Sequence, residues 1–124
     1  MPLVENGRFR RGDVVIETVA REYLEPLRRE GLDTLILGCT HYPLLTDIIG
    51  DIMGPGVTLI NTGEEAAWEL KRTLRGLDLL APEGPAGRAT LCASDQPEQF
   101  GVMASYFLGE SLTRPVQPVD IDRY

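Results

Sequence analysis

The chain has 124 residues, which predicts one domain with a hydrophobic core. Lys and Arg number 12 and Asp and Glu number 19, so the net charge is 12 − 19 = −7. This balance argues against a nucleic-acid partner, because nucleic-acid binding needs clustered basic side chains. The sequence has no run of 18 apolar residues and no signal-peptide layout at its start, so neither a membrane span nor secretion is predicted. Two cysteines are too few for a disulfide framework, and a cytoplasmic location is expected.

The first half of the chain alternates between helical and strand patterns. Asp13 is a suitable N-cap for a helix over 13–29, where apolar residues recur at helical spacing. The apolar run 34–37 predicts a strand with both faces buried, as in a parallel sheet. Pro43 is a favoured first residue for the next helix, which we expect over 43–53.

The second half continues this alternation. The elements expected there are strands at 57–60 and 89–93, helices at 62–75 and 96–108, an irregular loop at 77–88, and a tail that forms an edge strand or an extended segment at most. Capping-box spacing marks the start of both helices, at 62–65 and at 95–98. Helices that alternate with short apolar strands predict an α/β fold, with a parallel sheet flanked by helices. Three strands make a thin sheet, and no strand precedes the first helix, which hints at a missing piece.

The segment 38–43, Gly-Cys-Thr-His-Tyr-Pro, places the only histidine of the chain two residues after a cysteine. It lies between a predicted strand and a predicted helix, and the carboxyl ends of strands in open α/β sheets are where ligands bind. Free N–H groups at a helix N-terminus would favour an anion and activate the thiol of Cys39. The same spacing fits a buried structural cysteine with His41 capping the helix, so the residues alone leave both interpretations open.

Metal, protease and nucleotide sites are less well supported. One histidine and two cysteines cannot supply four zinc ligands without carboxylates, so no metal site is predicted. No oxyanion signature or third group accompanies Cys39 and His41, as a cysteine protease would need. The sequence has no glycine-rich nucleotide-binding motif, so no nucleotide cofactor is expected.

Outside this segment the residues favour structural roles. Cys92 lies in an apolar run and is expected to pack in the core, and Trp68 is expected to cover a core edge. Residues 61–63, Asn-Thr-Gly, are typical of a helix cap and turn, and the alternative is that they line the same cleft as Cys39. By its position alone, Glu5 is expected to be a solvated loop carboxylate.

The residues from Asp33 to Leu45 resemble the second catalytic-cysteine signature of the glutamate racemase family. Residues 2–7, Pro-Leu-Val-Glu-Asn-Gly, resemble the segment that precedes this signature in the family, and residues 60–66 resemble the stretch that follows it. The resemblance spans nearly the whole chain and weakens from Leu77 onward. The block 38–43 alone would also fit a related aspartate racemase, whereas the flanking segments favour glutamate.

The resemblance implies a fold of two similar α/β domains with the active site between them. It implies a cofactor-independent isomerase that interconverts L- and D-glutamate for peptidoglycan synthesis, and thus for cell-wall biogenesis and cell shape. Two cysteines would face opposite sides of the substrate α-carbon, because inversion removes a proton on one side and delivers one on the other. By this resemblance Cys39 is one of the pair and His41 assists it. Thr40 and His41 would bind substrate, and Glu5 would be a carboxylate near the cysteine.

The motifs of the family's N-terminal half, including its other cysteine, are not found in this sequence. The resemblance therefore implies the C-terminal half of a racemase, inactive alone. Residues 1–76 would be its second α/β domain, and 77–124 a continuation that returns toward the missing N-terminal domain. The expected partners are glutamate and that domain, and a homodimer is compatible with the resemblance. Two alternatives stay open: a non-catalytic amino-acid-binding or regulatory module, and an aspartate racemase.

Overall fold

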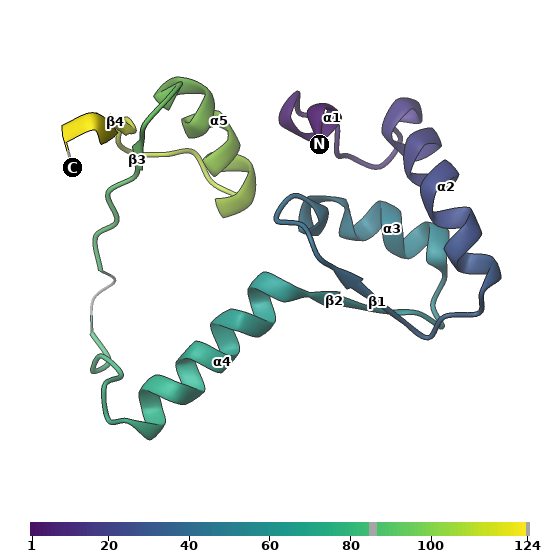
Figure 1. The fold of residues 1–124 in the computed structure, drawn as a ribbon, viewed down its shortest axis with the longest axis horizontal. Helices are drawn as coiled ribbons and strands as arrows, with labels where there is room; N and C mark the ends of the chain where they lie inside the picture. Colours follow the sequence, from purple (N-terminus) through teal and green to yellow (C-terminus); the bar gives the residue numbers. More distant parts are fainter. Residues whose placement is uncertain (85–86, 124) are drawn as a thin grey trace. The chain divides into compact units, whose positions relative to one another are not determined.

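The computed structural model describes residues 1–84 and 87–123, which divide into two compact units: unit 1, Met1–Ala81, and unit 2, Pro82–Tyr124. Unit 1 contains α1 (Pro2–Glu5), α2 (Val14–Arg29), β1 (Thr34–Leu37), the 3₁₀ helix η1 (Tyr42–Leu45), α3 (Thr46–Met53), β2 (Thr58–Asn61) and α4 (Thr62–Gly76). Its parallel strands with packed helices confirm the predicted α/β fold class (Figure 1). Within 1–84 and 87–123, every helix is too short or too polar to span a bilayer.

Helix α2 confirms the predicted helix over 13–29, because Asp13 caps it. The Asp13 carboxylate accepts a hydrogen bond of 3.0 Å from the Val15 N–H, and Arg8 donates two more to it, of 2.8 and 2.9 Å. The hydrogen bonding from Arg8 holds the pKa of Asp13 below its ordinary value. After the helix, Gly31 takes a φ of +69°, a conformation that glycine adopts without strain and that stops the helix.

Strands β1 and β2 form a two-stranded parallel sheet in which Leu37 lies opposite Asn61. The prediction that both faces of β1 are buried is wrong for this chain. Leu37 is 2% exposed, whereas Ile36 on the opposite face is 64% exposed. The reason is that the apolar core packs only against the face that carries Leu35 and Leu37.

The predicted helix over 43–53 is present but begins differently. The chain first forms the 3₁₀ helix η1 and becomes α-helical only at Thr46, in α3. Helix α3 packs against α2 and carries four of the nine buried core residues found among 1–84 and 87–123 (Figure 1). These nine form one cluster: Val4, Ile16, Ala20, Leu37, Leu45, Ile48, Ile49, Ile52 and Met53. All of them therefore lie in the first part of unit 1.

Helix α4 begins at Thr62 as predicted, but its cap is Asn61. The Asn61 Oδ1 atom accepts hydrogen bonds of 3.1 and 3.3 Å from two N–H groups of the first turn. The cap thus lies one residue before the start of the predicted capping box, and the Thr62 hydroxyl bonds elsewhere. The prediction that Trp68 covers a core edge is wrong, because α4 has no buried residue. Trp68 is 53% exposed, with the Lys71 Nζ atom 5.2 Å from its ring centre.

Unit 2 contains β3 (Cys92–Ala93), α5 (Pro97–Leu108), β4 (Gln117–Pro118) and the 3₁₀ helix η2 (Ile121–Arg123). The predicted strand over 89–93 is too long, since only its last two residues pair, in parallel with β4 of the tail. This run therefore adds no third strand to the sheet of unit 1. None of the described residues of unit 2 is buried, so the single core expected from the chain length does not extend into it.

Helix α5 is confirmed, but Asp95 is not its cap. The N-cap position is held by Gln96, which has a φ of +43° and makes no side-chain capping bond. Pro97 explains the difference, because proline is favoured in the first helical turn and keeps the residue before it out of the helical conformation. The helix therefore starts at the proline rather than at the capping-box residue.

Candidate active site

Cys39 lies two residues beyond the carboxyl end of β1, after Gly38. The Gly38 N–H donates a 3.0 Å hydrogen bond to the Ile36 carbonyl, and the Tyr42 N–H donates one of 3.0 Å to the Cys39 carbonyl. The backbone therefore turns on both sides of the thiol, which is half-buried. The predicted α-helix N-terminus beside the thiol is not there, because α3 begins only at Thr46. Activation of the thiol by a helix dipole has no support.

His41 connects Cys39 with Glu5. Its Nδ1 atom lies 4.0 Å from Cys39 Sγ, and its Nε2 atom lies 3.5 Å from Glu5 Oε1. Glu5 reaches this place because its segment is not a loop, as expected, but the helical turn α1. The neighbouring Val4, 1% exposed, anchors this turn in the core. The structure thus brings together a thiol, an imidazole and a carboxylate that the sequence singled out.

The order of these three groups favours one pattern of protonation. The Glu5 carboxylate favours a proton on Nε2 of His41, which leaves Nδ1 as an acceptor that faces the thiol. His41 can then accept the Cys39 proton, and the resulting imidazolium lies between a thiolate and a carboxylate that both stabilise its charge. The arrangement can therefore present Cys39 either as a base or as an acid.

Two further side chains lie beside this group, one against His41 and one against the thiol. The Thr40 Oγ1 atom lies 3.4 Å from His41 Nδ1, and Thr40 is exposed, so its hydroxyl can also meet a ligand. The Met1 Sδ atom lies 3.2 Å from Cys39 Sγ. Sequence reasoning missed Met1, because the start of the chain comes close to the thiol only through the turn α1.

Asn61 and Thr62 lie at the end of the neighbouring strand, β2. Asn61 caps α4, which confirms the first interpretation of this segment. Thr62 does more, since its hydroxyl donates a 3.1 Å hydrogen bond to the Leu37 carbonyl at the end of β1. The signal for such a contact is present in the sequence, because the carboxyl ends of neighbouring parallel strands meet at one edge of a sheet.

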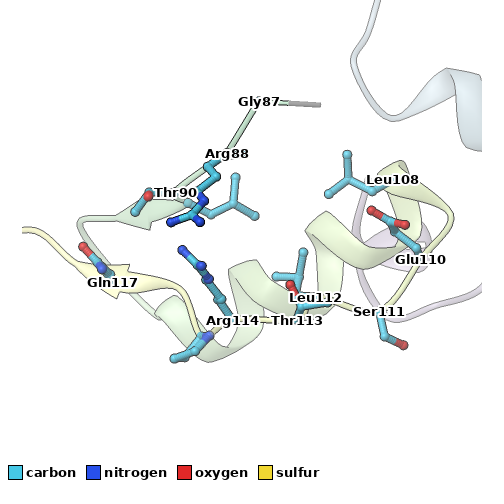
Figure 2. A pocket seen from close by; sticks show the side chains of 13 residues that line it. Gly87, Arg88, Thr90, Leu108, Glu110, Ser111, Leu112, Thr113, Arg114 and Gln117 are labelled. Atoms are coloured by element: carbon cyan, nitrogen blue, oxygen red, sulfur yellow. The ribbon is translucent and has the colours of Figure 1, made fainter. Parts of the chain in front are cut away.

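Cys92 does not belong to this group of residues. It is exposed in β3 of unit 2, so the prediction that it packs in the core is wrong. The physical reason is that no buried cluster forms around its two-residue strand. Unit 2 also contains a hollow of about 430 Å³, into which Arg88 and Arg114 point (Figure 2). The hollow is lined by neither cysteine nor histidine. Among residues 1–84 and 87–123, no three His, Cys, Asp or Glu side chains are grouped as metal ligands.

Comparison with known proteins shows what this chain resembles. No family model matches it. It is 48% identical to a glutamate racemase of Mycobacterium ulcerans over 103 residues, which are 81% of this chain and 38% of that protein. A glutamate racemase of Mycobacterium avium is 46% identical over 111 residues, 84% of this chain and 40% of that protein. The chain is homologous to the glutamate racemases. It spans about two fifths of the length of these curated racemases.

Solved racemase structures share the fold of this chain. The glutamate racemase of Thermus thermophilus, in complex with β-chloro-D-alanine, matches with a TM-score of 0.83 and 41% identity over 99% of this chain and 45% of its own. The glutamate racemase of Francisella tularensis, in complex with D-glutamate, matches with a TM-score of 0.80 and 28% identity over the same shares of the two chains. These matches confirm the resemblance and the α/β fold expected from the sequence.

Proposed function

We propose that this chain supplies one of the two acid–base groups of a glutamate racemase, with Cys39 as the reacting thiol. The observation that carries the proposal is the contact series Cys39–His41–Glu5, at a strand end of a chain homologous to glutamate racemases. Racemisation moves only a proton on the substrate α-carbon. A thiolate can remove that proton, and a thiol on the opposite face can return one, so two such acid–base groups account for the reaction.

In this mechanism Cys39 acts on one face of the α-carbon. As a thiolate it removes the α-proton of one glutamate enantiomer, and as a thiol it donates a proton when the other enantiomer is the substrate. His41 accepts and returns the thiol proton, so that both states of Cys39 are available. Glu5 orients His41 and stabilises its protonated form, and we assign the Thr40 hydroxyl, together with His41, to substrate binding.

The second acid–base group must act on the opposite face, because inversion delivers the new proton there. Cys92, the other thiol of the chain, belongs to unit 2, where it is exposed. Since the chain spans about two fifths of its curated relatives, we assign the second group to the part of a racemase that it does not match.

We further propose that residues 77–124 pack against this other part. The absence of buried residues in the described part of unit 2 supports this, because a segment without a core gains stability by docking on another domain. The D-glutamate bound to the related Francisella structure supports glutamate rather than aspartate as substrate. We assign the product to peptidoglycan synthesis, the use that the racemase resemblance implies.

A chimeric racemase tests the proposal, with this chain replacing the matching segment of a solved racemase. Circular dichroism would follow the conversion of L- and D-glutamate. Cys39→Ser should reduce racemisation in both directions by roughly 10²–10⁴-fold, the range for loss of a general acid–base group. In deuterated water the same variant should still exchange the α-proton of one enantiomer, through the group on the other face. The matched variant Cys92→Ser should keep full activity.

Two results would contradict the proposal. Racemisation by Cys39→Ser at the rate of the unmodified chimera would show that Cys39 is not an acid–base group. A folded chimera that binds glutamate without exchanging or inverting it would favour the alternative of a non-catalytic amino-acid-binding module. Faster turnover of aspartate than of glutamate would assign the chain to the aspartate racemases.

A further inference from the structure

Two arginines point into the hollow of unit 2. The hollow has a volume of about 430 Å³, and its lining comes from residues 87–91 and from residues within 108–117. This volume is in the range of small-molecule sites, roughly 300–1,000 Å³. Arg88 belongs to the first of these segments and Arg114 to the second, and their guanidinium groups point toward one another (Figure 2). Basic side chains from two separate segments therefore converge in one hollow.

The positive charge of these two arginines is not balanced within the hollow. In the part of the chain that the structure describes, neither Arg88 nor Arg114 forms an ion pair. Arg11, by contrast, donates two hydrogen bonds of 2.8 Å to the carboxylate of Asp51. Glu110 is the one carboxylate among the lining residues, and Figure 2 shows it at the other end of the hollow from the guanidinium groups. Two like charges that face one another repel, and an anion between them would remove this repulsion.

The rest of the lining suits an organic anion. Thr90 and Gln117 carry hydroxyl and amide donors, and Leu91, Leu108 and Leu112 provide apolar surface. A guanidinium group can bind a carboxylate or a phosphate with two parallel hydrogen bonds, which gives both affinity and orientation. Apolar walls with a few convergent polar groups are the usual composition of a small-molecule site. The hollow therefore fits a ligand that has an oxyanion at one end and an apolar group at the other.

We propose that this hollow is a binding site for a small organic oxyanion, a phosphate or carboxylate that carries an apolar group. Arg88 and Arg114 bind the oxyanion between them, and the leucine side chains contact the apolar group. A carboxylate side chain from the part of a racemase that this chain does not match has the same chemistry, and the test distinguishes that source from a free ligand. None of the residues assigned to racemisation lines the hollow, so the proposal does not rest on the proposed function.

The test titrates the isotope-labelled 124-residue chain with phenyl phosphate and follows its amide resonances by NMR. We expect saturable shifts in the two lining segments, and weaker binding of inorganic phosphate, which has no apolar group to bury. Arg88→Gln and Arg114→Gln should each raise the Kd by roughly 10- to 100-fold, the factor that a hydrogen bond to a charged group represents. Arg114→Lys should weaken binding less than Arg114→Gln does, because it keeps the charge and loses only the paired hydrogen bonds.

Arg21→Gln is the matched control, because Arg21 is an exposed arginine of α2 that forms no ion pair among the described residues. It removes the same charge and should leave the Kd unchanged. Arg88 and Arg114 are exposed as well, so their replacement should not change the circular-dichroism spectrum of the chain. If a glutamine variant does not give a folded spectrum, the lysine variant at the same position takes its place, with a smaller expected loss of affinity.

Several results would overturn the proposal. One is the absence of saturable shifts in the lining segments, and another is binding of phenyl phosphate no tighter than that of inorganic phosphate. An equal loss of affinity in Arg21→Gln would show that the probe responds only to net charge. The same titration of the chimeric racemase should still show binding. Loss of binding there would overturn the assignment to a free ligand, because a carboxylate of the other part would then occupy the hollow. None of these results bears on whether Cys39 serves a racemase.

Discussion

His41 is the residue on which the proposed chemistry depends most, because it contacts both the thiol of Cys39 and the carboxylate of Glu5. It lies on the Cys39 side of the site. The second acid–base group of a racemase must act from the opposite face of the substrate, out of reach of the same imidazole. A change at His41 should therefore slow one of the two proton transfers and leave the other nearly as it was.

His41→Asn in the chimeric racemase should lower kcat/KM by roughly 10²-fold, the lower range for acid–base catalysis. The two enantiomers have equal energy, so the loss must be the same in both directions. The kinetic isotope effect of an α-deuterium should differ between L- and D-glutamate. Breaking the bond between the α-carbon and its hydrogen limits the rate of the variant only in the direction in which Cys39 is the base. Equal isotope effects for α-deuterated L- and D-glutamate would show that His41 does not serve Cys39 alone.

The residues of this site differ in how far they could be predicted. Cys39 and His41 are two positions apart, so the sequence alone identified them as a pair. Glu5 is distant in sequence, and only the racemase resemblance indicated that it belongs near the cysteine. Its contact with His41 depends on Val4, whose burial fixes the turn α1, and that packing has no local signal.

At the scale of elements, the sequence was sufficient to predict a helix where a capping residue and the helical spacing of apolar residues indicate the same start. Asp13 and the apolar spacing after it predicted α2 correctly. The run 89–93 has the apolar composition of a strand, but only two of its residues pair. A strand needs a partner of matching length, and its partner β4 also has only two residues. The start of α5 followed Pro97 rather than the capping box, since proline restricts the backbone before it more strongly than a cap favours it.

The cap of α2 makes the stability of unit 1 depend on pH. The pKa of Asp13 is lowered in the folded chain, mainly by its hydrogen bonds with Arg8. Its stabilising contribution is therefore fully present above the unfolded value of about 3.9 and is lost as the pH falls through the lower folded value. Asp13→Asn keeps a capping side chain but removes the charge. The variant should be less stable than the parent chain near pH 6. This gap, the difference between their unfolding free energies, should close below about pH 4.

Urea unfolding followed by circular dichroism at several pH values would measure this gap. Arg8→Gln removes the same ion pair from the other side and should give a gap with the same pH dependence. A difference between Asp13→Asn and the parent chain that stays constant from pH 6 to pH 3 would contradict the assignment.

The core packing of α3 can be tested with two identical substitutions. Ile48, 1% exposed, belongs to the core cluster, and Ile48→Ala should cost about 2–5 kcal/mol of unfolding free energy. Ile36→Ala, on the exposed face of β1, removes the same atoms and should change the unfolding free energy by less than about 0.5 kcal/mol. Equal losses in urea unfolding would mean that the face carrying Ile36 is covered in solution.

At the scale of the whole molecule, the buried residues are unevenly distributed. All nine lie between Val4 and Met53, and none of the described residues of unit 2 is among them. The length of the chain suggested a single core, but length cannot show whether the apolar residues of one segment pack on another. The exposed face of β1, the exposed side chains of α4 and the coreless unit 2 all agree with a chain that matches about two fifths of a racemase.

The central claim is that Cys39 acts on one face of glutamate and that a second group must come from elsewhere. The direct measurement incubates the purified 124-residue chain with L-glutamate in deuterated water and analyses the product by chiral chromatography and mass spectrometry. We expect no D-glutamate above the blank, because a single thiol cannot both remove and deliver a proton on opposite faces. Any incorporation of deuterium should leave the L-configuration and disappear in Cys39→Ala. Formation of D-glutamate well above the blank, lost in Cys39→Ala, would contradict the account, because it would require a second acid–base group within these residues.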